Sequence, residues 1–498
     1  MGFIQKDALR IMITSYLGVG LGYLNKAVLF IFILSTEQIG LMNLIISVGL
    51  LFAQFANLGT VYTTWKFFPF FNNKDKSHHG FLPLMLFIVS IGVVLFTILA
   101  FVFRTTIEEI YITRSPLFSE YFIWVIPIGV SYVFFMVFEI YLRALYKNLM
   151  AVIAYEIVLR FILTILLGLV WLNKINFEQL VIIQSVSYLI PALILILYLK
   201  KLGELNLSIK TIQISKRFKN ILIQFSAFNY INTLGYVLVT SLDLLMVSQI
   251  VGLEATGVYS TMVLFAGAIL VPYKSLHRAS VPLVSDYWKR REMNKMQELY
   301  TKFSSVSLVI GLVFFLLIWL NIDVLFSFLP ADFFAGKWIF FFLIIGKLID
   351  MYCGLNGSIL VTSKKYKYDV YFTLLLIGVV YGLNLYLIPI YGAIGAAIST
   401  LIALLLYNAF RIFFVAYHFK MLPFETGQLK IIFLGLITLL IGSITINLVE
   451  NIILQIVFQF CLFTTLFLVP LYFLNLEPET VGFMKNIFQK SRQKMKLF

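Results

Sequence analysis

Charged residues are scarce in this chain of 498 residues: Asp, Glu, Lys and Arg make up only 12%, against about 25% in an ordinary soluble protein. Hydrophobic residues make up 61%. They fall in runs of about 20 or more, which is long enough to cross a hydrocarbon core of roughly 30 Å. The period-two alternation of a transmembrane barrel is absent. The composition therefore predicts an all-α, polytopic membrane protein.

Cysteines and catalytic motifs are also lacking. Cys353 and Cys461 each stand alone in an apolar span, so neither a disulfide framework nor a metal site is predicted. The sequence has no D-x-D, no G-x-x-x-x-G-K-[ST] and no H-E-x-x-H. The pair His78-His79 lies in a loop without acidic or cysteine partners and is interpreted as solvated. We therefore expect a transporter without cofactors rather than an enzyme.

Basic residues set the predicted topology. We count 29 of the 38 Lys and Arg residues, Arg411 among them, in segments on one side of the membrane and only four on the other. Because positive loops stay inside, both termini are predicted to be cytoplasmic and the protein to lie in the cell (inner) membrane. The net charge of +15 is then a topology signal and an attraction to anionic lipid, not a nucleic-acid site. The fourteen predicted spans are residues 9–34, 39–66, 81–103, 118–142, 149–172, 178–200, 219–249, 255–284, 303–328, 337–362, 367–390, 392–418, 428–448 and 452–475.

A weak internal repeat organises these spans. Gly257 lies 217 residues after Gly40, as Asp243 lies 217 residues after Lys26. A fixed offset between such landmarks is what a duplicated transporter leaves in its sequence. We therefore predict two pseudo-symmetric six-helix lobes, at residues 1–205 and 206–420. Residues 421–498 hold two extra C-terminal helices and a basic cytoplasmic tail.

Two pairs of charges lie on single predicted helices. Glu156 and Arg160 are spaced i,i+4 and are interpreted as a structural ion pair. Lys347 and Asp350 are spaced i,i+3, with Asn356 extending the polar face. For this second pair two interpretations stay open. The residues form a structural ion pair, or they line the cavity, with Lys347 as a cationic contact and Asp350 in coupling or gating.

Four further charges have no opposite partner on their own helix. Lys26 and Asp243 lie at equivalent repeat positions, so they are either gating or coupling partners across a central cleft, or a snorkelling lysine and a locally satisfied carboxyl. Lys274 and Arg278 are of like sign at i,i+4, and an anion between them would relieve their repulsion. A guanidinium suits phosphate, although snorkelling also explains Arg278.

Several stretches resemble one known family. The run from Ser241 to Ser248, then Gly252 to Tyr259 and Pro282, resembles helices seven and eight of polysaccharide and O-antigen flippases. The segment Gly354-Leu-Asn-Gly357 resembles helix ten, and Asn384 to Ala397 resembles the turn between helices eleven and twelve. These flippases belong to the multidrug/oligosaccharidyl-lipid/polysaccharide exporter superfamily.

The resemblance implies two six-helix lobes around a cavity and transport by alternating access. The implied cargo is an undecaprenyl-pyrophosphate-linked oligosaccharide, moved from the inner to the outer leaflet. Cationic cavity residues would hold its pyrophosphate, with Lys26, Lys274, Arg278 and Lys347 as the candidates. Implied partners are membrane lipids and the glycosyltransferases and polymerase of the same pathway.

Three alternatives remain. A cation-coupled multidrug antiporter of the same fold would need an acidic, aromatic-lined cavity. A flippase for another lipid-linked precursor, such as a peptidoglycan or teichoic-acid unit, is the second alternative. An integral-membrane polysaccharide polymerase or ligase would need large outward loops, and the longest here are about residues 104–117 and 329–336.

Overall fold

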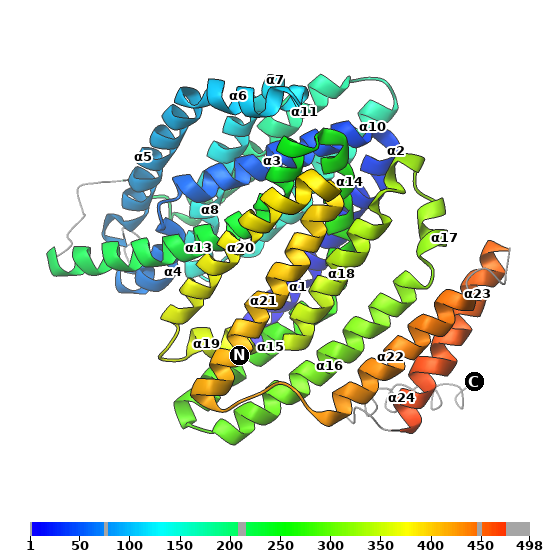
Figure 1. Ribbon diagram of the computed structural model, residues 1–498. Coiled ribbons are helices and arrows are strands. Elements are labelled where there is room, and N and C mark those ends of the chain that lie inside the picture. The colour runs from blue at the N-terminus through cyan, green and yellow to red at the C-terminus, as the bar shows by residue number, and fades with distance from the viewer. Residues whose placement is uncertain (1, 74–77, 208–215, 446–450, 475–498) are drawn as a thin grey trace, which may run out of the picture. The chain divides into compact units, whose positions relative to one another are not determined.

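Every element that the structure describes is a helix (Figure 1). The computed structural model describes residues 2–73, 78–207, 216–445 and 451–474. Twelve of its helices are long and apolar enough to cross a membrane, and two bent helix pairs raise the count to 14. The predicted all-α, polytopic fold with about fourteen spans is confirmed. The predicted basic tail after residue 474 lies outside the described part of the chain.

Most helix boundaries lie near those of the predicted spans, but the helix predicted at residues 303–328 begins at Met293, and the span predicted at residues 39–66 is divided into two helices. The first part of the chain contains α1 (Gly2–Tyr23), η1 (Leu24–Leu29), α2 (Phe30–Ile33), α3 (Thr36–Ala56), α4 (Thr60–Phe67), η2 (Phe68–Phe70), η3 (His78–Gly80), α5 (Phe81–Val102), α6 (Arg104–Ile112), α7 (Pro116–Tyr121), η4 (Phe122–Trp124), α8 (Val125–Ala144), α9 (Leu149–Val152), η5 (Ile153–Val158), α10 (Leu159–Trp171), α11 (Phe177–Ser187) and α12 (Leu189–Leu202). The second part contains α13 (Lys216–Ile250), α14 (Leu253–Gly267), α15 (Leu270–Arg290), α16 (Met293–Trp319), α17 (Ile322–Ser327), η7 (Ala331–Phe333), α18 (Gly336–Cys353), α19 (Asn356–Thr362), α20 (Lys367–Tyr391), α21 (Ala393–Phe419), α22 (Thr426–Thr445), α23 (Ile452–Phe463), η9 (Thr464–Leu468) and α24 (Val469–Phe473).

The chain divides into two compact units. The first contains residues 1–261 and 388–393, and the second contains residues 262–387 and 394–498. The first unit thus holds α13 and most of α14 in addition to the first six spans. The lobe boundaries predicted at 205/206 and 420/421 come from the internal repeat in the sequence, not from packing, and they stay a prediction.

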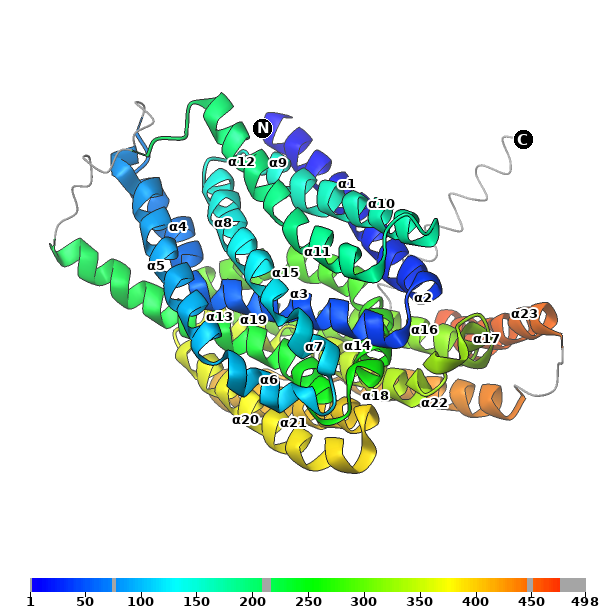
Figure 2. The ribbon, with the colours of Figure 1, turned by 90° about the horizontal axis from the view of Figure 1, so that it is seen from above.

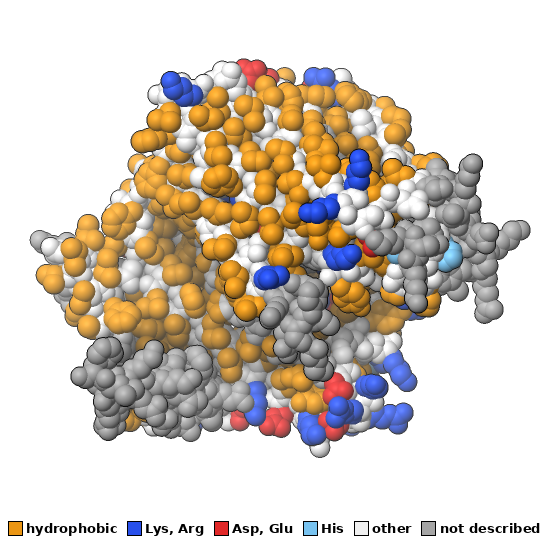
Figure 3. Space-filling view, turned by 180° about the vertical axis from the view of Figure 1, so that it is seen from behind, with side chains coloured by type: hydrophobic (Ala, Val, Ile, Leu, Met, Phe, Trp, Pro, Cys, Tyr) orange, Lys and Arg blue, Asp and Glu red, His pale blue; other side chains and the backbone are white. Residues whose placement is uncertain are grey.

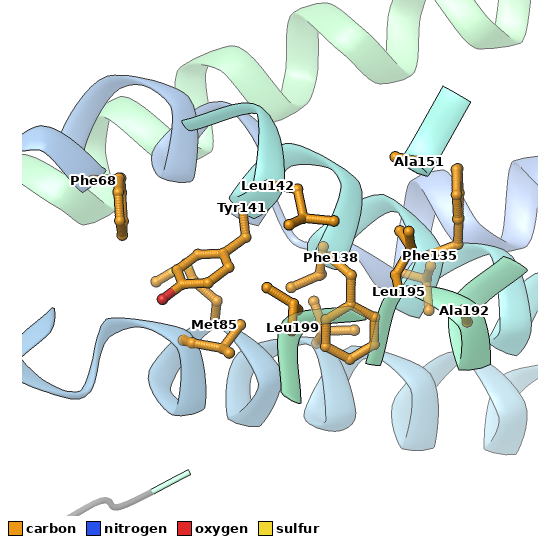
Figure 4. Packing of buried hydrophobic residues seen from close by; sticks show 14 of the residues in the cluster. Phe68, Met85, Phe135, Phe138, Tyr141, Leu142, Ala151, Ala192, Leu195 and Leu199 are labelled. Carbon is orange, nitrogen blue, oxygen red and sulfur yellow. The ribbon is translucent and has the colours of Figure 1, made fainter. Parts of the chain in front are cut away.

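Helix α8 lies at the centre of the first unit, packed against α3, α4, α5 and α12 (Figure 2). Its large apolar side chains fill the space between these helices. Tyr141 and Phe138 are almost fully buried and lie near Met85 of α5 and Leu199 of α12 (Figure 4). Within a bilayer, where lipid tails are as apolar as these side chains, their close van der Waals packing is what stabilises the helix bundle. This core fixes the ends of α3, α4 and α8, where a cavity forms.

Helices α3 and α14 cross in close contact near their first turns. A Cβ atom on Gly40 would lie 2.0 Å from the carbonyl oxygen of Leu253, and one on Gly257 would lie 1.9 Å from the carbonyl oxygen of Thr36. Only glycine permits two backbones to approach this closely. The two contacts are reciprocal, and each partner lies at the repeat offset of 217 residues from its equivalent.

Two helix pairs in the second part of the chain are bent. Helices α14 and α15 are bent by 51°, and α18 and α19 by 52°. Pro272 lies in the first turn of α15, where its missing N–H costs no intrahelical bond. At the second break Gly354 has a φ of 71° and a ψ of −127°, a conformation that strongly favours glycine. Polar side chains lie close to both breaks, such as Lys274 in α15 and Asn356 at the start of α19.

Hydrophobic side chains cover broad areas of the molecular face shown in Figure 3. Many large apolar side chains of the outer helices are exposed, such as Phe32, Val102 and Leu440. A hydrocarbon environment suits such surfaces, as expected for a multi-pass membrane protein.

Candidate functional site

Lys26 lies in η1, a π-helical turn that interrupts the first span. Such turns often occur at functional positions. The Lys26 ammonium donates a hydrogen bond to Asn43 Oδ1 at 2.8 Å. Asn43 Nδ2 in turn donates to Ser260 Oγ at 3.0 Å, and these two residues lie 217 positions apart. The structure therefore connects Lys26 to the glycine crossing of α3 and α14 through a neutral amide.

Asp243 is buried on α13, with 8% of its surface exposed. Its Oδ2 atom accepts a hydrogen bond of 2.8 Å from the hydroxyl of Tyr259 on α14. Tyr259 precedes Ser260, the partner of Asn43, so Asp243 and Lys26 both bond to residues near the crossing. Their direct pairing across a cleft stays a prediction.

Glu156 and Arg160 form an ion pair of 2.5 Å between their nearest side-chain atoms. Arg160 also donates to the backbone oxygen of Gly18, and its own carbonyl accepts from Asn25 Nδ2 at 2.8 Å. Glycines on α1 make room for the pair: a Cβ atom on Gly18 or Gly22 would lie 2.6 Å from a side-chain atom of Glu156 or Arg160. These contacts fasten the first span to the fifth, as a structural pair does.

Lys274 and Arg278 are exposed on one side of α15. Neither forms an ion pair or a side-chain hydrogen bond with any residue in the described ranges. The neighbouring face of α15 is anchored instead to the segment 354–358, through Tyr273 to a carbonyl oxygen at 3.4 Å and through His277 to a serine hydroxyl at 3.0 Å. Two cations of like sign thus stand one turn apart on a firmly held helix.

Asp350 belongs to a chain of amides that joins three helices. Its Oδ1 atom accepts from Asn408 Nδ2 of α21 at 2.9 Å, and Asn408 Oδ1 accepts from Asn356 Nδ2 of α19 at 2.9 Å. Lys347 is half-buried one turn before Asp350 on α18. These hydrogen bonds hold the Asp350 carboxylate beside the break between α18 and α19.

Two side chains, those of Arg411 and His78, have surroundings that the sequence did not suggest. Arg411 was counted among the cytoplasmic basic residues, but it lies within α21, where it is paired with the buried Asp369 of α20 and stacked 4.0 Å from the ring of Tyr407. His78 was interpreted as solvated, yet it is buried and its Nε2 lies 2.9 Å from a carboxylate oxygen of Glu204. The partners are 42 and 126 residues away in sequence, so no local spacing reveals them.

Comparisons with known proteins agree with this architecture. The family model described as "Polysaccharide biosynthesis protein" matches residues 4–288. No curated protein matches the sequence. The fold is similar to that of the lipid II flippase MurJ in an inward closed conformation, with a TM-score of 0.71, 16% identity, and coverage of 94% of this chain and 99% of that one.

Other transporters of the MOP superfamily have a similar fold. An inward-facing MATE family transporter of the MOP superfamily has a TM-score of 0.63 at 12% identity, covering 83% of this chain and 98% of that one. A MOP superfamily transporter from Pyrococcus furiosus, described as having a binding pocket of reverse polarity, has a TM-score of 0.53 at 12% identity, covering 84% and 96%. Since the family model covers more than half of the sequence, the chain belongs to the polysaccharide biosynthesis protein family.

Proposed function

We propose that the protein flips a polyprenyl-pyrophosphate-linked oligosaccharide, such as an undecaprenyl-linked O-antigen, capsule or exopolysaccharide unit. The cargo moves from the inner to the outer leaflet of the cytoplasmic membrane by alternating access, with both termini of the protein cytoplasmic. The family and the transporter fold support this general activity. The observation that carries the specific proposal is the pair Lys274 and Arg278, which has no counter-charge in the described ranges.

The chemistry of this pair favours a polyanion. Like charges at i,i+4 repel one another, and cations in an apolar span are costly unless something compensates them. A pyrophosphate carries charge on two adjacent phosphates, and a guanidinium binds one of them with two parallel hydrogen bonds. Lys26 and Lys347 serve as further cationic contacts during passage. We expect Asp243 and Asp350, each held by neutral donors, to couple transport to a cation or proton.

Reconstitution into liposomes tests the proposal. The probe is the lipid-linked oligosaccharide extracted from the source cells, and membrane-impermeant periodate reports the share of glycan that faces outward. Lys274→Gln and Arg278→Gln each remove a charge-assisted contact of about 1.5–3 kcal/mol, so transport efficiency should fall about 10–150-fold. Lys289→Gln removes the same charge from the exposed end of α15 and should leave transport unchanged.

A second probe separates this function from its alternatives. The same glycan on an uncharged polyprenol should be transported poorly by the wild type and no worse by Lys274→Gln. If the liposomes instead exchange an organic cation for Na⁺ or H⁺, and Asp243→Asn abolishes that exchange, the protein is a multidrug antiporter. Processing of the glycan without movement would indicate an enzyme.

A further inference from the structure

A small cavity lined by both apolar and polar side chains lies in the first unit, where the end of α3 meets α4, α8 and α13. Its volume is about 170 Å³. It lies at the opposite end of α3 from the glycine crossing, which is the predicted cytoplasmic side. None of the site residues predicted from the sequence lines it. We propose that this cavity binds one pyranose ring of the lipid-linked glycan as the cargo enters from the cytoplasm. This proposal rests on the proposed function.

Several hydrogen bonds hold the turn between α3 and α4 that borders the cavity. Asn57 caps α3, and its Oδ1 accepts the N–H of Gly59 at 2.8 Å. Gly59 has a φ of 78°, and a Cβ atom there would lie 2.8 Å from the carbonyl oxygen of Ser226 on α13. The hydroxyls of Thr63 and Ser226 bond to each other across the same contact. A glycine is therefore required where α13 passes the turn.

Helix α4 presents two aromatic side chains to the cavity. Thr60, Thr63, Thr64 and Phe67 form its buried face. Tyr62 and Trp65, spaced i,i+3 on the other face, line the cavity and are 37% and 61% exposed. The Tyr62 hydroxyl and the Trp65 indole N–H have no hydrogen-bond partner in the described part of the chain. Aromatic rings pack well against the C–H face of a pyranose, and their polar edges then reach its hydroxyls.

Planar polar groups complete the lining. The Gln54 amide accepts from Asn57 through its oxygen at 3.1 Å, so its two N–H donors remain for a ligand. Glu139 and Arg143 of α8 are paired with each other and offer acceptors and donors side by side. Amides, carboxylates and guanidinium groups bind neighbouring hydroxyls in pairs, which is how vicinal diols are recognised.

The size and charge of the cavity point to a single sugar ring. A cavity of about 150 Å³ holds one benzene-sized ring, whereas pockets for drug-sized ligands span about 300–1,000 Å³. The one ion pair in its lining is internally neutral, so the cavity offers no net charge to a pyrophosphate. We therefore assign binding of the pyrophosphate to Lys274 and Arg278, and binding of the glycan to this cavity.

Ligand-observed NMR on the full-length protein in detergent tests this assignment. The probe is the oligosaccharide released by mild acid from the lipid-linked precursor of the source cells, without lipid or phosphate. It should bind saturably, with magnetisation reaching the C–H protons of one ring. Trp65→Ala should weaken binding at least about tenfold and Gln54→Leu severalfold, whereas Trp65→Phe should retain most of it. Trp171→Ala, which removes a 70% exposed tryptophan from α10, is the matched control.

The outcomes distinguish the two proposals. No saturable binding, or binding that Trp65→Ala and Trp171→Ala affect equally, overturns the sugar site and leaves Trp65 as an aromatic anchor at the membrane interface. Lys274→Gln should keep full binding of the free glycan while losing transport of the lipid-linked form. Binding of the glycan by a protein that does not flip the lipid-linked form would support the sugar site and refute the flippase.

Discussion

Replacing Gly40 with alanine should separate α3 from α14. The new Cβ would lie 2.0 Å from the Leu253 carbonyl oxygen, whereas carbon and oxygen normally approach to about 3.3 Å. Because that neighbour is backbone, no side-chain rotation relieves the contact, and the helices must move apart by about 1 Å. Overpacking of this kind costs up to about 3 kcal/mol, and the higher helix propensity of alanine returns about 1 kcal/mol. We expect a net loss of about 2 kcal/mol in the free energy of unfolding.

Equilibrium unfolding in mixed micelles, followed by tryptophan fluorescence at rising SDS fraction, measures this loss. Gly20→Ala is the matched control, because a Cβ atom there meets nothing within 4 Å and the substitution should stabilise α1 by up to about 1 kcal/mol. Gly257→Ala should resemble Gly40→Ala, and the double variant should lose less than the sum because one separation relieves both clashes. Equal stability of Gly40→Ala and Gly20→Ala would refute the close crossing.

Three further perturbations test other contacts. Glu156→Gln should lower the free energy of unfolding by about 1–3 kcal/mol, since Arg160 loses its counter-charge. The double variant Glu156→Gln/Arg160→Gln should lower it by less than the sum of the two single variants, and SDS unfolding measures all three. Asp243→Asn should abolish the dependence of transport on the coupling cation while the unfolding midpoint stays within error, and a retained cation dependence would exclude the coupling role. Asn408→Ala should cost about 1–3 kcal/mol by leaving Asp350 without its amide donor, and a wild-type unfolding midpoint would show that water replaces the amide.

Hydrophobicity and short spacings predicted much of this fold. Apolar runs located the spans, because each must cross the hydrocarbon core by itself. The i,i+4 spacing placed Glu156 and Arg160 on one helix face, where they form an ion pair. The two bent pairs fell within single predicted spans, since composition alone does not show where a helix breaks.

Partners on different helices were beyond such reasoning. The sequence marked Lys26 and Asp243 as unusual, but it gave no sign that a neutral amide and a tyrosine hydroxyl hold them. Trp65 went unnoticed because one aromatic residue among many carries no periodic signal. Arg411 appeared to be a topology charge because its partner Asp369 is distant in sequence. Each depends on tertiary packing, which local periodicity does not encode.

At the crossing of α3 and α14, the two predicted repeats have the same glycine contacts but carry different charges. Contacts across a twofold axis must be reciprocal, and the glycine contacts of Gly40 and Gly257 obey this rule at a constant offset. At that same offset Lys26 corresponds to Asp243, so the backbone relation persists while the charge is reversed. A scaffold needs symmetric small residues to pack, whereas the proposed transport of an anion coupled to a cation would use opposite charges in the two predicted repeats. This difference explains why the predicted repeat is visible in the glycines of the crossing and weak in the charged residues.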